Sequence, residues 1–158
     1  KTPGDPAALA WVIDVLAIEG EKGGGTPAAI GQLGLNLGTS AASVQQLDKA
    51  RRLLRVALPY LPAADYAVCA ERLGNVLLLS QRPKDAIAVL TEAAGRAQNA
   101  PQLRLMLARA YTLDGQGARA RSEYQALLAL PGLMPDARQT IQQELAALGP
   151  AQGAASAR

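Results

Sequence analysis

Apolar side chains recur along most of the chain at the three- and four-residue spacing of an amphipathic helix. Residues 44–60 show this clearly, because Leu47, Ala50, Leu54 and Ala57 form one stripe. Prolines, glycines and capping residues interrupt the pattern, so we expect about eight helices, with a loop at 38–43. The expected helices are 6–19, 28–37, 44–60, 62–80, 83–98, 101–113, 118–130 and 136–148.

The composition supports an all-α fold. Ala and Leu, two of the strongest helix formers, dominate, whereas aromatic residues make up only 3% of the chain and Phe and His are absent. Strands prefer β-branched and aromatic residues, so their scarcity argues against a sheet. The net charge of +3 is too small to indicate nucleic acid, and few aromatic side chains are present to stack on bases.

The second half of the chain repeats itself with a period of 34 residues when 67–100 is aligned with 101–134. In each copy a small residue precedes an alanine by 12 positions, and a bulky residue follows that alanine by four. Small residues suit close approach of two helices, and large ones fill the gap to the next pair. The matching positions are Leu73, Gly74, Leu77, Ala86, Leu90 and Ala93, then Leu107, Ala108, Tyr111, Ala120, Tyr124 and Leu127.

On these residues the sequence resembles the tetratricopeptide repeat family. An upstream copy fits less well, with a longer loop at 38–43. Its carrying residues are Leu33, Gly34, Leu37, Ala50, Leu54, Ala57 and Pro62. One departure is the large aromatic that the family usually has early in the first helix, which is Ala70 in one copy and Arg104 in the next. The resemblance implies about three repeats stacked as a right-handed superhelix of antiparallel helix pairs.

The resemblance also sets the expected organisation of the chain. Residues 1–26 are expected to hold a first helix and a Gly-rich linker, 27–148 the repeats with a C-terminal capping helix, and 149–158 a flexible tail. Trp11, in the first helix, is interpreted as a core residue or an interface anchor. The tail is hypothesised to dock in the groove as a placeholder for a ligand.

In this family the first helices of the repeats line a concave groove that receives a peptide. Carried over by position, the expected partner-binding residues are Glu71, Asn75, Leu78, Leu79, Gln102, Leu105, Arg109 and Thr112, flanked by Val68 and Leu113. The upstream copy would add Ala28, Gly31, Leu35, Gly38 and Thr39. Asn75, after Gly74, resembles part of the clamp that some members use for a carboxylate, but Glu71 stands where a lysine is wanted. Asn75 and Arg109 are therefore expected to make ordinary peptide contacts, with a solvated face as the alternative.

Catalytic and metal chemistry find little support in the sequence. Without histidine, no Ser-His or Cys-His pair and no His-containing zinc site can form. Cys69 lies between apolar residues and is interpreted as a small buried hydrophobe. Gly23 to Gly25 lacks the GK[ST] ending of a phosphate-binding loop. We expect no enzyme activity and no cofactor.

A basic cluster lies on the expected third helix, at Lys49, Arg51, Arg52 and Arg55. In the family this helix faces the convex side, so the cluster is interpreted as a solvated face, with an acidic partner or a membrane surface as the alternative. Arg109→Ala is accordingly expected to weaken partner binding more than Arg52→Ala.

The leading functional hypothesis is a non-enzymatic module that binds a peptide or a partner protein as a scaffold or adaptor of a larger bacterial envelope or secretion assembly. The alternatives are a free-standing chaperone and a regulatory appendage of an enzyme. The Ala-, Leu- and Arg-rich composition favours a GC-rich bacterial genome, and the start at Lys1 without Met suggests a mature or excised piece. Nothing indicates a homo-oligomer or a membrane span, and the compartment stays open, with periplasm or envelope slightly favoured.

Overall fold

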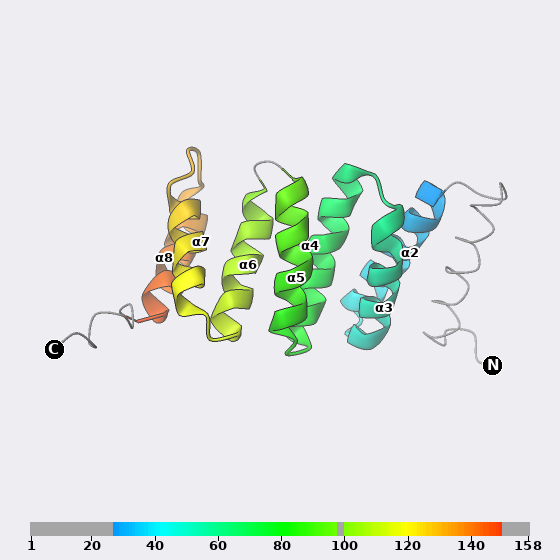
Figure 1. The fold of residues 1–158 in the computed structure, drawn as a ribbon, viewed down its shortest axis with the longest axis horizontal. Helices are drawn as coiled ribbons and strands as arrows, with labels where there is room; N and C mark the ends of the chain where they lie inside the picture. The colour runs from blue at the N-terminus through cyan, green and yellow to red at the C-terminus, as the bar shows by residue number, and fades with distance from the viewer. Residues whose placement is uncertain (1–26, 98–99, 150–158) are drawn as a thin grey trace.

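The computed structural model describes residues 27–97 and 100–149, and these form a row of helices without a strand (Figure 1). The expected helix at 6–19 with Trp11, the linker and residues 150–158 of the tail lie outside the described residues. The helices are α2 Pro27–Ser43, α3 Leu47–Ala57, α4 Ala63–Leu79, α5 Pro83–Arg96, α6 Pro101–Leu113, α7 Gly117–Leu128 and α8 Pro135–Ala147, with the 3₁₀ turn η1 at Leu58–Tyr60.

The helices pack as three consecutive pairs, α2 with α3, α4 with α5, and α6 with α7. Each pair then packs on the next in chain order, which is the arrangement of a helical repeat protein. The all-α prediction is confirmed, whereas the right-handed sense of the superhelix stays a prediction.

A loop of the same conformation connects the two helices in each of the three pairs. Loops 44–46, 80–82 and 114–116 have their central residue in the left-handed region, with φ of 59° at Gln45, 57° at Gln81 and 75° at Gly115. The amide of each third loop residue donates to a carbonyl five residues back, over 2.8–2.9 Å. The donor–acceptor pairs are Gln46 to Ala41, Arg82 to Leu77 and Gln116 to Tyr111.

This shared loop corrects the expected start of the upstream repeat. The predicted loop at 38–43 is wrong, because α2 continues to Ser43 and the turn comes at 44–46. The repeat position of Gly74 and Ala108 is therefore held by Gly38, not by Gly34. Gly38 sits in the helix because a Cβ there would lie 2.7 Å from Leu54 Cγ, so close packing rather than a helix end requires the glycine.

The expected third helix, 44–60, is also too long at both ends. Gln45 is left-handed, so α3 begins at Leu47, and the chain tightens into η1 at Leu58–Tyr60. Proline at 59 has no amide hydrogen to continue the α-helical hydrogen-bond pattern, which accounts for the end of α3.

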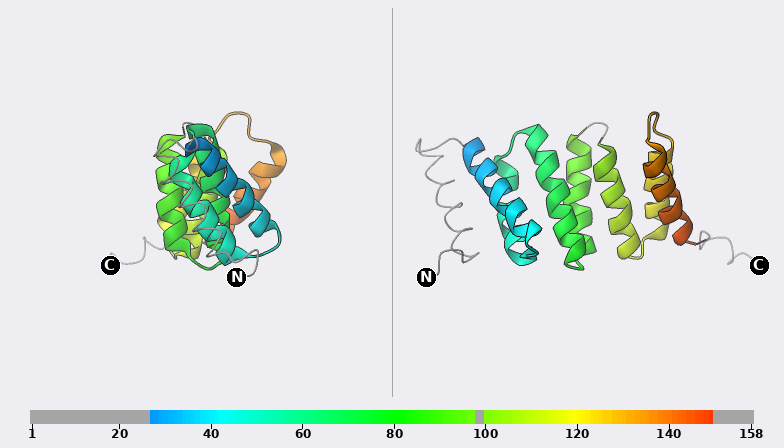
Figure 2. Two further views of the ribbon diagram at one scale, coloured as in Figure 1. Left: turned by 90° about the vertical axis from the view of Figure 1, so that its right-hand side faces the viewer. Right: turned by 180° about the vertical axis from the view of Figure 1, so that it is seen from behind.

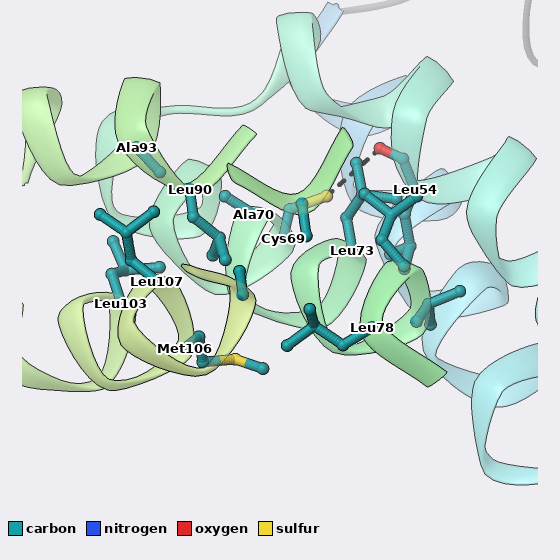
Figure 3. Close-up of a cluster of buried hydrophobic side chains, with 14 of the residues drawn as sticks. Leu54, Cys69, Ala70, Leu73, Leu78, Leu90, Ala93, Leu103, Met106 and Leu107 are labelled. Atoms are coloured by element: carbon teal, nitrogen blue, oxygen red, sulfur yellow. Dashed lines mark hydrogen bonds between the residues drawn. The ribbon is translucent and has the colours of Figure 1, made fainter. Parts of the chain in front are cut away.

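The core runs through the middle of the row (Figure 3). Ala50, Ala86 and Ala120 are fully buried, one in each second helix, and the bulky residue four positions later is buried as well. Those bulky residues are Leu54, Leu90 and Tyr124, so the repeat pattern seen in the sequence is the packing pattern of the core.

The interpretation of Cys69 as a buried residue is confirmed. Its side chain is fully buried and its thiol donates to the Leu54 carbonyl over 3.4 Å (Figure 3). Burial raises the pKa of Cys69 to about 12, so the thiol stays protonated and unreactive at neutral pH.

Helix α8 occupies the place of a first helix in a fourth repeat, since Pro135 follows Pro101 by 34 residues. Only Ile141 of α8 is buried, and the helix packs on α7 without close backbone approach to α6. It stands out to one side of the row in the end-on view of Figure 2. This largely polar helix covers the end of the stack, as a cap does.

Candidate functional site

A hollow of about 510 Å³ opens between α4, α6 and α8, near the C-terminal ends of these three helices. It exists because α8 leans on α7 and leaves a gap to α6 that side chains line but do not fill. The lining residues are Asn75, Leu78, Leu79, Gln81, Met106, Arg109, Thr112, Leu113, Tyr124, Glu144 and Ala147.

Two leucines make this wall unusual for a water-facing surface. Leu79 is 60% exposed and Leu113 is 53% exposed, and they hold the same repeat position on α4 and α6. Next to them Leu78 and Met106 are buried in the core. The hollow thus presents an apolar strip that is continuous with the core and open to a ligand.

A charged pair crosses the hollow from α6 to α8. Arg109 donates hydrogen bonds to the Glu144 carboxylate from two nitrogens. The distance is 2.6 Å from Nη2 to Oε1 and 3.1 Å from Nε to either carboxylate oxygen. The Tyr124 hydroxyl donates to Oε2 of the same carboxylate over 2.9 Å. The Arg109 side chain is still 40% exposed and that of Glu144 is 27% exposed, so both groups remain within reach of a ligand.

The environment shifts the pKa of both Glu144 and Tyr124. Partial burial acts to raise the pKa of Glu144, but hydrogen bonds from Arg109 and Tyr124 outweigh burial and hold this pKa below its usual value. Burial raises the pKa of Tyr124 to about 12. At neutral pH Glu144 is therefore an anion and Tyr124 a neutral hydrogen-bond donor.

The lowered pKa of Glu144 predicts a small loss of stability in acid. A carboxylate with a depressed folded-state pKa stabilises the fold above its unfolded pKa of about 4.3, and this contribution disappears as the pH falls through the folded value. Because the pair is partly exposed, we expect no more than about 1 kcal/mol. Urea unfolding at about pH 7 and about pH 3 should show a smaller acid effect for Glu144→Gln than for the parent. Equal acid effects in the two proteins would contradict this.

Five of the eight expected partner-binding residues line the hollow, as does the flanking Leu113: the five are Asn75, Leu78, Leu79, Arg109 and Thr112. Glu71, Gln102 and Leu105 lie nearer the N-terminal ends of the same helices and do not line it. The Thr112 hydroxyl is turned back on its own helix and donates to the Ala108 carbonyl over 2.9 Å. Arg109, expected to be available for a peptide, is instead bound to Glu144.

The upstream residues need correction. Gly31 and Gly38 do not face a groove but are buried where α2 meets the next elements. A Cβ on Gly31 would lie 2.8 Å from the Tyr60 carbonyl oxygen. Register with the other two repeats places Gln32, Leu35, Thr39, Ala42 and Ser43 at the equivalent positions, of which Leu35 is itself buried.

The basic cluster stays on the helix surface of α3. Arg51 bridges to Asp48 over 3.1 Å, while Arg52 and Arg55 are exposed. Its residues contribute nothing to the hollow, so the interpretation as a surface apart from the expected groove fits the structure.

Sequence reasoning missed the contributions of Gln81, Met106, Tyr124, Glu144 and Ala147 to the hollow. A signal for α8 was present, since its first residue repeats the position of Pro101. Glu144 follows Arg109 by 35 residues, one repeat and one residue, which puts opposite charges on neighbouring first helices.

In residues 27–97 and 100–149, no cluster of His, Cys, Asp and Glu is suited to hold a metal ion. Within the same residues no helix is long and apolar enough to cross a membrane.

A model of the tetratricopeptide repeat family matches residues 77–131, from the end of α4 through α5, α6 and α7 to the turn beyond. The predicted resemblance to the tetratricopeptide repeat family is therefore confirmed over these residues. No curated protein matches the chain. Repeats of this family are generally interaction modules without catalysis of their own, and their partners are proteins.

Proposed function

We propose that this chain is a non-enzymatic module that holds a segment of a partner protein in the hollow between α4, α6 and α8, as a scaffold or adaptor of a larger assembly. The observation that carries the proposal is the pair of exposed leucines, Leu79 and Leu113, at one repeat position on the wall of that hollow.

The free energy of burial gives these leucines a reason to bind. Fully burying a leucine side chain stabilises a protein by roughly 1.5–3 kcal/mol relative to leaving it exposed, and more than half of each side chain is open to water here. Polar groups beside them, Asn75, Arg109 and Glu144, can orient a ligand by hydrogen bonds. A peptide supplies both kinds of contact, because it alternates apolar side chains with backbone and side-chain polar groups.

The proposal predicts that peptide binding depends on the two leucines. Short peptides selected from a displayed random library on the immobilised protein should bind the double variant Leu79→Glu, Leu113→Glu at least about tenfold more weakly than the parent. Affinities can be compared by calorimetry or fluorescence anisotropy. The replaced side chains are exposed, so circular dichroism should show an unchanged fold.

Met134→Glu is the matched control. Met134 is also an exposed apolar residue, 71% exposed, but it lies at the start of α8, away from the hollow. Its replacement should leave peptide affinity unchanged. If selected peptides bind the double variant as well as the parent, the hollow is not the binding site and the proposal fails.

A further inference from the structure

We propose that α8 is a movable wall of the hollow. In the free protein Glu144 of α8 binds Arg109, and in the complex an acidic side chain of the partner takes the place of Glu144. This inference rests on the proposed function and adds two things to it: the chemistry of the bound segment and the way in which access to the site is controlled. The bound segment would be a helix that places a glutamate or an aspartate beside apolar residues.

The charges of the hollow point to a carboxylate as the ligand of Arg109. Arg109 is the sole cation and Glu144 the sole anion among the residues that line the hollow. A guanidinium presents a planar fork that binds a carboxylate through two parallel hydrogen bonds, and Glu144 occupies the edge formed by Nε and Nη2. A partner carboxylate that binds this same edge of Arg109 must replace Glu144, so the internal pair competes with the partner.

Helix α8 is held weakly enough to be replaced. Ile141 is its one buried residue and Leu145 packs partly buried against the core, whereas α4 buries eight residues and α6 buries six. Beyond the Arg109–Glu144 pair, its polar ties to the stack are few: Tyr124 to Glu144, Arg138 to the Leu128 carbonyl, and Arg121 to the Gly149 carbonyl. Segments with few buried apolar contacts open at a fraction of the free energy of global unfolding.

The connection to α8 allows such an opening. Residues 129–134 join α7 to α8, and Gly132 in this turn has a φ of 78°. A Cβ on Gly132 would meet no atom within 4 Å, so the turn is open at this residue, while Leu130 and Leu133 on either side of it pack against the core. Gly132 is therefore the residue at which the backbone can change conformation when α8 moves.

The geometry of the internal pair favours an acidic side chain over a chain terminus. Glu144 reaches Arg109 as a side chain on a helix, with Ala147 one turn further along the same wall. Arg109 is the one cation among the lining residues, and it already binds a side-chain carboxylate, that of Glu144. The partner segment should copy α8, with its acidic residue on Arg109 and an apolar residue against Leu79 or Leu113.

The test uses peptides selected from the displayed library on the full-length chain. We expect the selected peptides to share an acidic residue, and its replacement by the matching amide should weaken binding about tenfold or more. Amidation of the peptide C-terminus should change little. Glu144→Gln should tighten binding about threefold to tenfold by removing the competing charge, and Arg109→Gln should weaken it by a comparable factor.

A second ion pair provides matched controls. Arg104 and Glu123 join α6 to α7 over 3.2 Å outside the hollow, so Glu123→Gln and Arg104→Gln should leave the affinity unchanged. Hydrogen exchange should show faster exchange in α8 when a peptide binds the parent. If α8 does not move, its amide hydrogens should instead exchange more slowly when the peptide binds.

Each contrary outcome has a distinct meaning. Selected peptides without an acidic residue, equal affinity for the parent and Glu144→Gln, or slower exchange in α8 would overturn the inference. Sensitivity to C-terminal amidation would overturn the choice of a side-chain carboxylate. None of these results touches the proposed function, which fails only if binding ignores Leu79 and Leu113.

Discussion

Replacing Tyr124 by alanine is expected to lower the free energy of unfolding by about 3–5 kcal/mol. Tyr124 is only 2% exposed and is the largest fully buried side chain in the part of the chain that the structure describes. It holds the repeat position at which Leu54 and Leu90 pack beside Gly38 and Gly74. Alanine would leave a cavity between α6, α7 and the base of the hollow, and equilibrium urea unfolding measures its cost.

Tyr124→Phe separates packing from hydrogen bonding. Phenylalanine keeps the ring but loses the 2.9 Å hydrogen bond to Glu144, so it should cost only about 0.5–1.5 kcal/mol. A loss of less than about 1 kcal/mol for Tyr124→Ala would mean that the ring does not hold the third helix pair together.

Gly74→Leu is expected to destabilise the fold by about 1–3 kcal/mol through overpacking. A Cβ at Gly74 would lie 2.7 Å from Leu90 Cδ2 and 3.0 Å from Leu90 Cγ, and both residues are buried. The larger side chain would therefore push α4 and α5 apart. The fall in the midpoint of thermal unfolding measures the effect.

Gly95→Leu is the control for helix propensity. Gly95 lies in the last turn of α5, and a Cβ there would meet no atom within 4 Å. Leucine should be neutral there or stabilise by up to about 1 kcal/mol, because glycine is a poor helix residue. A melting temperature of Gly74→Leu equal to that of the parent would show that the two helices do not meet at Gly74.

Most of the repeat could be predicted from the sequence because its signals are periodic and reinforce one another. Ala86 and Leu90 return as Ala120 and Tyr124, and all four are buried where the spacing placed them. The same reasoning failed at 38–43, where Gly38 and polar neighbours look like a helix end. Local propensity cannot reveal that Gly38 lies against Leu54, and that contact decides the helix.

The sequence contains a spacing that would have placed the upstream repeat correctly. The spacing of 12 residues between the small residue and the alanine holds for Gly74 with Ala86 and for Ala108 with Ala120. Applied back from Ala50, it identifies Gly38 instead of Gly34. A spacing set by helix packing is a stronger guide than the resemblance of short motifs.

The hollow was only half predictable. Residues of α4 and α6 such as Asn75, Leu79 and Arg109 follow from repeat position, because equivalent helices present equivalent faces. The contribution of Glu144 depends on how far α8 leans from α6, and that angle results from the sparse packing of α8 on α7. No local pattern encodes such an angle.

The central claim is that a partner segment lies in the hollow, and site-specific photo-crosslinking tests it most directly. A photoreactive amino acid at Leu79 or at Leu113 should crosslink a selected peptide in high yield, because both side chains face the hollow. The same group at Met134, which is exposed but lies elsewhere, should give little product. Strong crosslinking at Met134 or at Arg52, with none at Leu79 and Leu113, would contradict the account.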